Sequence, residues 1–306
     1  MLNGVSRGQR SEPRLVLYGP AKIGKTTFAS QFPAPIIVCT EDGAEGLSVD
    51  RFPKATTWQQ VVDNLTTVSQ GEHDYETVVL DTLNGAAELA AQHVCATLFG
   101  GDWGPKGFAS FGQGNGATSE EMRRLLPILD ACRDRSMNVV LFAHTGLQSA
   151  KDPVQGDYQK YAPDMDRRIW GRFAKWADMI GRAEYEYVVL KADRPGAGRV
   201  KGTSTRIVHW SGSAAEDAGT RAGFEMPDTT LLSYEAFAAA LGLGTSTLEE
   251  VKALWHLLDK EQAAKAMAWL GAKTLDGADT QKLKELLNRL RALAGEQTEG
   301  KEEGNG

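Results

Sequence analysis

One short segment constrains the fold of this chain more than any other: Gly19-Pro20-Ala21-Lys22-Ile23-Gly24-Lys25-Thr26 fits the pattern G-x-x-x-x-G-K-[ST]. Its glycines allow a tight turn in which successive backbone N–H groups point at one anion. The pattern requires a buried strand before it and a helix after it. Leu15 to Tyr18 is a short apolar run, and Thr27 to Gln31 can form a helix that Phe32-Pro33 ends. The segment therefore predicts a phosphate-binding loop between a strand and a helix.

The loop predicts that the chain binds a nucleotide together with Mg²⁺. Lys25 would reach the β- and γ-phosphates, and the hydroxyl of Thr26 would bind the metal ion. The expected nucleotide-binding residues are Gly19, Pro20, Ala21, Lys22, Ile23, Gly24, Lys25, Thr26 and Thr27.

Composition describes an ordinary globular protein, with 306 residues, 42% hydrophobic and 24% charged. We find no apolar run of membrane-spanning length and no signal-peptide pattern in residues 1–10, so neither membrane insertion nor export is expected. Cys39, Cys95 and Cys132 form no metal-type pair, and we expect them in the core of a cytoplasmic protein. The net charge of -6 argues against general coating of nucleic acid but permits a local basic groove.

Apolar runs typical of strands alternate with stretches long enough for helices, notably Leu83 to Leu98 and Glu120 to Ser136. This alternation predicts an α/β fold with a mostly parallel sheet flanked by helices. The last two runs, which flank residues 193–198, resemble a hairpin added at the sheet edge. The predicted strands are Leu15 to Tyr18, Ile36 to Cys39, Thr77 to Leu80, Val139 to Phe142, Tyr185 to Lys191 and Arg206 to Trp210.

The pattern divides the chain into four parts: a flexible arm over residues 1–12, a core over 13–240, a helical region over 245–294 and a disordered acidic tail over 295–306. In the helical region, Thr247 to Glu250 resembles a capping box, and further helices are expected over Glu261 to Leu270 and Thr280 to Ala294. The apolar stripe of the last helix indicates a small helical core or a partner-binding face. It consists of Leu283, Leu286, Leu287, Leu290 and Leu293.

Polar residues follow three of the predicted strands. Asp81 ends an apolar run and would help to hold Mg²⁺. Glu41, with Asp42 as its competitor, would polarise the attacking water; alternatively it is a solvated loop carboxylate or caps the next helix. His144 suits a hydrogen bond to the γ-phosphate that senses hydrolysis, although an isolated histidine can also be structural.

The ordered set of phosphate loop, Glu41, Asp81-Thr82 and His144 resembles the RecA superfamily, and in particular the small phage ATPases that act with single-strand annealing recombination. The resemblance covers about Pro13 to Trp210. It implies a RecA-like core with Glu41 as general base, Lys25 and His144 beside it in the catalytic site, and Thr26 and Asp81 at the metal. It also implies ATP hydrolysis, single-stranded DNA as a partner, a homo-oligomeric ring or filament, and contact with a single-strand-binding or other recombination protein.

Two segments are candidates for holding single-stranded DNA, or else are ordinary surface loops. Phe99 to Ser119 is rich in glycine and contains aromatic side chains that can stack on bases. The second is expected as a loop directly after His144, running to Pro163. The candidate DNA-binding residues are Lys106, Phe108, Phe111, Lys151, Tyr158 and Lys160.

The segment from Asp166 to Trp176 is the most basic of the chain. One of its cations would reach a neighbouring subunit's γ-phosphate, or the segment is an amphipathic helix with Ile169, Phe173 and Trp176 inward. The candidate trans-acting cations are Arg167, Arg168, Arg172 and Lys175.

Two other functions also fit the sequence. The first is a DnaB-like helicase or packaging motor that shares the core. The second is a nucleotide-gated adaptor that recruits replication or recombination proteins through its C-terminal helices or acidic tail.

Overall fold

The computed structural model describes residues 12–43, 46–154, 156–190, 199–242, 247–272, 274–275, 278, 282–283, 285–287 and 289–290. The chain divides into two compact units, Met1–Ala240 and Leu241–Gly306. The predicted acidic tail and all but Glu12 of the predicted N-terminal arm lie outside the described residues.

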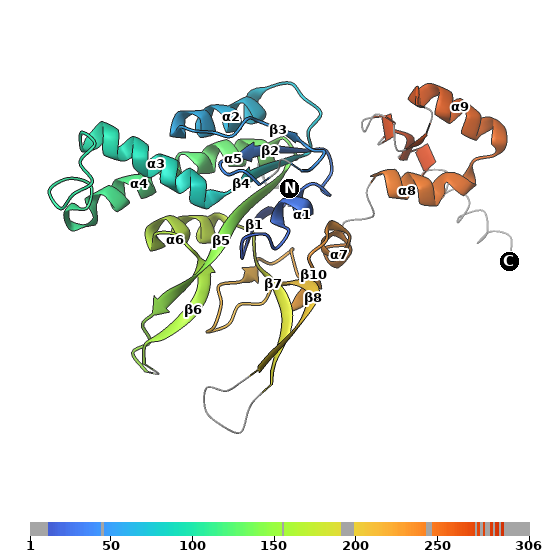
Figure 1. The fold of residues 1–306 in the computed structure, drawn as a ribbon. Helices are drawn as coiled ribbons and strands as arrows, with labels where there is room; N and C mark the ends of the chain where they lie inside the picture. The colour runs from blue at the N-terminus through green and yellow to red at the C-terminus, as the bar shows by residue number, and fades with distance from the viewer. Residues whose placement is uncertain are drawn as a thin grey trace, which may run out of the picture. The chain divides into compact units, whose positions relative to one another are not determined.

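The first unit is built around a largely parallel sheet with the strand order β10-β8-β7-β1-β5-β4-β2-β3 (Figure 1). The six strands from β7 to β3 are mutually parallel, whereas β8 and β10 are antiparallel to their neighbours. The predicted α/β fold with a mostly parallel sheet is therefore confirmed. The strands of this path are β1 Arg14–Gly19, β2 Pro35–Cys39, β3 Asp50–Arg51, β4 Thr77–Asp81, β5 Asn138–Ala150, β7 Met179–Leu190, β8 Arg199–His209 and β10 Thr229–Leu231.

Helices cover both faces of this sheet because its central strands are apolar on both sides. Val16 and Tyr18 of β1 face a core formed with five helices: α2 Trp58–Gln70, α3 Leu83–Leu98, α4 Gln113–Arg123, α5 Leu125–Asp134 and α6 Arg167–Trp176. On the other face α1 (Lys25–Ala29) and α7 (Tyr234–Ala240) pack together, and the rings of Phe28 and Phe237 lie 5.9 Å apart. All three cysteines are buried and free, as expected.

The predicted loop after His144 is wrong, because β5 continues to Ala150 and pairs antiparallel with β6, Tyr158–Pro163. Figure 1 shows this β5/β6 hairpin projecting beyond the sheet. Its alternating polar residues resemble a loop in the sequence, but cross-strand pairing decides their conformation.

The predicted β7/β8 hairpin forms, and residues 191–198 between its strands lie outside the described part of the chain. It lies near the edge of the sheet, as expected, but it is not the outermost element, since β10 pairs with residues 207–209 of β8. β7 starts at Met179 and pairs in parallel with β1, while β10 pairs with the outer side of β8. A short strand, β9 (Gly219–Thr220), also pairs with β7.

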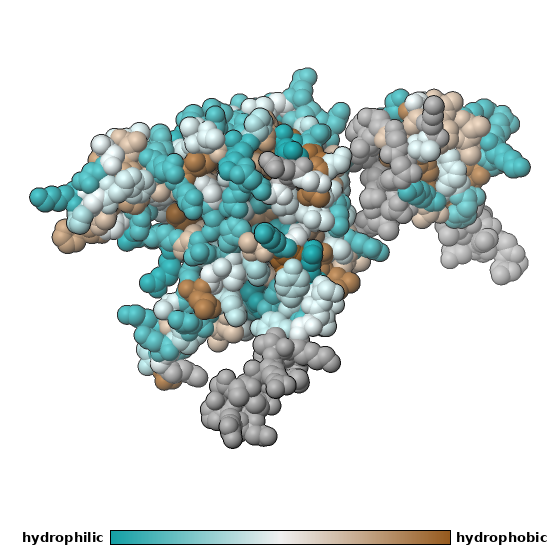
Figure 2. Space-filling view, in the orientation of Figure 1, coloured by the Kyte–Doolittle hydropathy of each residue, from teal (hydrophilic) through white to brown (hydrophobic). Residues whose placement is uncertain are grey.

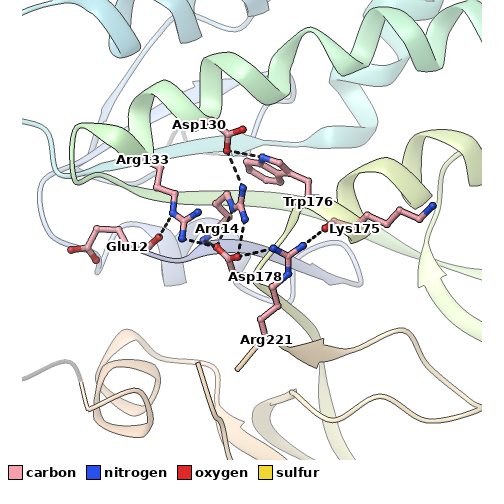
Figure 3. A network of polar contacts seen from close by, with 8 residues as sticks. All are labelled: Glu12, Arg14, Asp130, Arg133, Lys175, Trp176, Asp178 and Arg221. Atoms are coloured by element: carbon pink, nitrogen blue, oxygen red, sulfur yellow. Dashed lines mark hydrogen bonds and ion pairs between the residues drawn. The ribbon is translucent and has the colours of Figure 1, made fainter. Parts of the chain in front are cut away.

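A cluster of ionised groups joins the beginnings of β1 and β7 (Figure 3). The carboxylate of Asp178 is buried and accepts hydrogen bonds from Nε and Nη2 of Arg14 at 3.0 and 2.8 Å. The backbone N–H of Asp178 in turn donates to the carbonyl of Arg14 at 2.9 Å. Arg133 and Arg221 also approach the carboxylate, each at 3.4 Å. This Asp178 cluster fixes β7 beside the strand that leads into the phosphate loop.

The second unit contains α8 (Thr247–Leu254), the short helix η2 (Trp255–Leu257) and α9 (Lys260–Leu270). Asp259 caps α9 in a capping box with Gln262. Leu283, Leu286, Leu287 and Leu290 of the predicted stripe lie in one apolar cluster with Val251 and Leu270, so they form a small helical core. Leu293 and much of the predicted helix over 280–294 lie outside the described residues.

Candidate functional site

The phosphate loop connects β1 to α1 in the predicted order. Gly24 has φ of 105°, a left-handed conformation that favours glycine. Lys25 is buried, and its ammonium donates to the backbone carbonyls of Gly19 and Pro20, each at 3.0 Å. Burial lowers the pKa of Lys25, against the charges of Asp81 and Glu41. The lysine therefore lies folded over the loop, whereas the side chain of Ile23 is buried in the core.

Thr26 and Asp81 meet where Mg²⁺ would be expected. The hydroxyl of Thr26 donates to Oδ2 of Asp81 at 2.7 Å, although the two residues come from α1 and β4. Burial raises the pKa of Asp81, and the hydrogen bond from Thr26 opposes that shift. The described residues contain no cluster of three metal-ligating side chains. One hydroxyl and one carboxylate suit Mg²⁺, which keeps several waters and takes its other ligands from phosphates.

Glu41, which follows β2, lies in a network of short hydrogen bonds. Its Oε1 accepts from the hydroxyl of Thr82 at 2.6 Å, and its Oε2 lies 2.9 Å from Nε2 of His144. The hydrogen bond from His144 lowers the pKa of Glu41, burial raises it, and Thr82 lowers it further. Asp42, the competing carboxylate, is instead paired with Lys54 at 2.6 Å. The ionised form of Glu41 is therefore favoured, and it is Glu41 that contacts His144.

His144 lies between the strand that leads into the Gly19–Thr26 loop and the strand that ends at Asp81, because β5 is inserted between β1 and β4. Gly19 is in register with His144. Its backbone is fixed on both sides. The N–H of His144 donates to Oδ1 of Asn84 at 2.8 Å, and its carbonyl accepts from the N–H of Asp164 at 2.8 Å. Nδ2 of Asn84 donates to the carbonyl of Asp164 at 2.6 Å and closes the set. His144 is thereby linked to α3 and to the end of the β5/β6 hairpin.

These side chains converge on one pocket of about 630 Å³. It contains the predicted residues Lys25, Thr26, Glu41, Asp81 and His144, together with Asp42. The other lining residues are Ala21, Lys22, Gly24, Thr27, Gly43, Gly46, Leu47 and Arg206. Of these, Arg206 was not anticipated: the sequence shows only that a cation begins an apolar strand, which is a weak signal.

The candidate loop Phe99 to Ser119, which we call the α3–α4 segment, is partly helical, since α4 begins at Gln113. Lys106 and Phe111 are exposed, and Phe111 has 99% of its surface accessible. Phe108 is a correction: it is buried against Val94 and Cys95, so its ring is not available for base stacking.

The β5/β6 hairpin carries the other predicted DNA contacts. Lys151 and Tyr158 are exposed. Lys160 is partly buried and paired with Asp217 at 2.6 Å, so its charge is compensated within the chain. On the face drawn in Figure 2, apolar side chains are scattered among hydrophilic ones, and some lie over this hairpin.

The four candidate trans-acting cations all lie on α6 and outside the pocket. Arg168 donates to the carbonyl of Gly112 at 3.1 Å, and Arg172 binds Ser119 and Glu120 of α4. Arg167 and Lys175 are exposed. Ile169, Phe173 and Trp176 are buried, which matches the amphipathic interpretation of this helix.

A family profile described as an AAA domain matches residues 11–222, more than two thirds of the chain. A search of curated proteins found no match. The chain therefore belongs to this AAA domain family. Membership indicates a P-loop ATPase that binds nucleotide, usually with Mg²⁺. Within the described residues, none of the helices is long and apolar enough to cross a membrane.

Proposed function

We propose that this AAA-family protein is an Mg²⁺-dependent ATPase of the RecA-like type that binds single-stranded DNA and promotes phage-type recombination or annealing. One observation carries the proposal. Lys25, Thr26, Asp81, Glu41 and His144 come from four separate parts of the chain and line one pocket at the carboxyl edge of the sheet. Phosphoryl transfer depends on positioned cations, a metal site and a group that orients water, and this set supplies each of them.

Each side chain has a separate task in hydrolysis. Phosphate oxygens would replace the carbonyls of Gly19 and Pro20 as acceptors for Lys25. Mg²⁺, held by Thr26 and Asp81, would neutralise charge on the phosphates. Glu41 would accept a proton from the attacking water once one of its oxygens is released from Thr82 or His144.

The same strand that carries His144 continues into the β5/β6 hairpin. A change at the γ-phosphate that moves His144 would act on Asn84 and Asp164 through the hydrogen bonds to its backbone. Because Asp164 directly follows β6, the nucleotide site and the hairpin share one short path. Such a path supports coupling between ATP hydrolysis and the affinity for DNA.

The proposed DNA contacts lie on two projecting elements. The β5/β6 hairpin offers Lys151 and Tyr158, and the α3–α4 segment offers Trp103, Lys106 and Phe111, with Trp103 half-exposed. Aromatic faces stack on bases of any sequence, and lysines neutralise phosphates. This combination suits single-stranded DNA without a sequence preference.

Hydrolysis is tested by Glu41→Gln, with Asp42→Asn as the matched control. We expect Glu41→Gln to lower the rate of phosphate release by about 100-fold or more while ATP still binds, because general-base catalysis contributes about that factor. Asp42→Asn should keep the rate within about threefold, since Asp42 is paired with Lys54 on the surface and a surface pair contributes little. If Glu41→Gln hydrolyses ATP at the wild-type rate, the assignment of Glu41 is wrong.

DNA binding is tested by measuring ATP turnover and fluorescence anisotropy with single-stranded oligonucleotides at low salt. The double variant Lys151→Ala/Tyr158→Ala should bind more weakly. Arg123→Gln, at the end of α4 remote from Phe111, should bind as the wild type does. Absence of both DNA binding and DNA-stimulated turnover in the wild type would overturn the DNA part of the proposal and leave the ATPase part standing.

A nucleotide-gated adaptor is the second candidate. It is favoured by the separate C-terminal unit, whose described residues form an apolar core of their own. If Glu41→Gln abolished hydrolysis but left recombination in cells intact, the adaptor function would replace the enzymatic one.

A further inference from the structure

Arg206 lies against the phosphate loop although it follows Gly24 by more than 180 positions. It belongs to β8, and only one strand, β7, lies between β8 and β1 in the sheet. The side chain of Arg206 can therefore reach the loop that follows β1. A β-carbon built on Gly24 would stand 2.6 Å from Nη1 of Arg206, so the guanidinium touches the glycine that turns the loop. Arg206 also lines the pocket that contains Lys25 and Thr26.

The charge of Arg206 is not neutralised by a carboxylate of the described residues. Its guanidinium lies over the ring of Tyr185, 5.9 Å from the ring centre, and Tyr185 is its cross-strand neighbour. Another arginine of the same hairpin shows the contrast: Arg182 is clamped between Glu184 and Glu216. Arg206 therefore presents an uncompensated cation to the pocket, held from one side by an aromatic ring.

We propose that Arg206 is a phosphate-binding residue that acts within its own chain, donating hydrogen bonds to the phosphates of a nucleotide bound at the Gly19–Thr26 loop. This inference rests on the proposed nucleotide-binding function and extends it to a residue outside every sequence motif. Guanidinium suits the task because its planar fork can donate two parallel hydrogen bonds to phosphate oxygens. The cation expected from α6 of a neighbouring subunit is then not needed to complete binding, because the chain supplies one of its own.

The test is the affinity for a slowly hydrolysed ATP analogue and for ADP, measured by calorimetry with Mg²⁺. We expect Arg206→Gln to weaken binding of the ATP analogue by about tenfold or more, the range of a hydrogen bond to a charged group. The affinity of Arg206→Lys should lie between those of the wild type and Arg206→Gln, because lysine keeps the positive charge but lacks the planar fork of the guanidinium. Arg123→Gln, another exposed arginine, should bind as the wild type does. Circular dichroism and thermal unfolding should be unchanged in all three, since both side chains are exposed.

Three results would contradict the proposal, and they are distinguishable. Wild-type affinity in Arg206→Gln would overturn the role of Arg206 and leave nucleotide binding intact. Failure of the wild type to bind any adenine nucleotide would overturn the proposed function and Arg206 with it. The third result comes from a mixing experiment, in which excess Lys25→Ala protein, which carries an intact Arg206, is added to the Arg206→Gln variant. Recovery of tight binding would show that Arg206 acts on a neighbouring subunit and would overturn its assignment to its own chain.

Discussion

Replacing Asp178 with asparagine should destabilise the first unit more than removing the other carboxylate that binds Arg14 in the cluster of Figure 3, Asp130. The Asp178 carboxylate is 4% exposed and accepts three hydrogen bonds from Arg14, whose side chain is 12% exposed. Asparagine keeps the shape but removes the charge, so Arg14 stays buried with one counter-charge fewer. Breaking a buried pair costs about 3 to 5 kcal/mol. Because Asp130 still binds Arg14, we expect the lower end, about 3 kcal/mol.

Asp130→Asn is the matched control, since Asp130 binds the same arginine at 3.0 Å but is 43% exposed. It should cost less than Asp178→Asn, about 1 kcal/mol, because the Asp130 carboxylate is partly in contact with water. Urea unfolding followed by tryptophan fluorescence measures both, and Trp176 packs within the cluster, 5.0 Å from the guanidinium of Arg14. If Asp178→Asn costs no more than Asp130→Asn, the reasoning from burial is wrong.

The pH dependence gives the same prediction a second test. Burial alone would raise the pKa of Asp178, but the hydrogen bonds and charge of Arg14, followed by Arg133, hold it below the ordinary value. The folded state therefore binds this proton less readily than the unfolded state. The stabilisation is fully present above the unfolded pKa of about 3.9 and is lost as pH falls through the lower folded pKa. The difference between wild type and Asp178→Asn should stay constant from pH 5 to 8 and shrink in acid.

Two further predictions concern the site and the α3–α4 segment. His144→Ala should shift the acidic limb of the pH–rate profile to higher pH, because the hydrogen bond that lowers the pKa of Glu41 is lost. If the limb does not move, His144 does not control the protonation of Glu41. Phe108→Ala should cost about 3 kcal/mol in urea unfolding, because it removes a buried ring. Phe111→Ala should leave unfolding unchanged and weaken single-stranded DNA binding, by about 1 to 3 kcal/mol if the ring stacks on a base. Equal effects of the two phenylalanine variants on both measurements would contradict the distinction.

The sheet and the ends of its parallel strands were predictable because the signals are local. An apolar run fixes a strand, the residue after it lies at the carboxyl edge, and parallel strands bring such residues to the same edge. The sequence therefore identified Glu41, Asp81 and His144 as candidates, and the structure places all three in one pocket. Their mutual contacts were not predictable from the sequence. Glu41 contacts His144 and Thr82 because β2, β4 and β5 are neighbours in the sheet, and the order of strands in a sheet is not a local signal.

The β5/β6 hairpin and Phe108 show where local signals are insufficient. Residues 144–150 combine polar and small side chains, which are typical of a loop, but β6 supplies the backbone partners that make them a strand. Phe108 lies in a glycine-rich segment that suggested exposure, yet Val94 and Cys95 of α3 leave an apolar surface that the ring covers. In both cases a contact between segments, and not composition, decides the structure.

The position of the Arg206 side chain depends on the register between β7 and β8. In a strand, successive side chains alternate between faces, so a slip of one residue would turn Arg206 away from Gly24 and bring Ile207 to the pocket. The pair Tyr185–Arg206 is the last regular one before a shift in the β7/β8 register, and beyond it Tyr187 pairs with Gly202. The irregularity thus lies between Arg206 and the turn of the hairpin. The pairs on the other side of Arg206 are regular and fix its position. An arginine in the pocket is consequently a property of the β7–β8 pairing, and a variant that shifts this register should weaken nucleotide binding even with Arg206 intact.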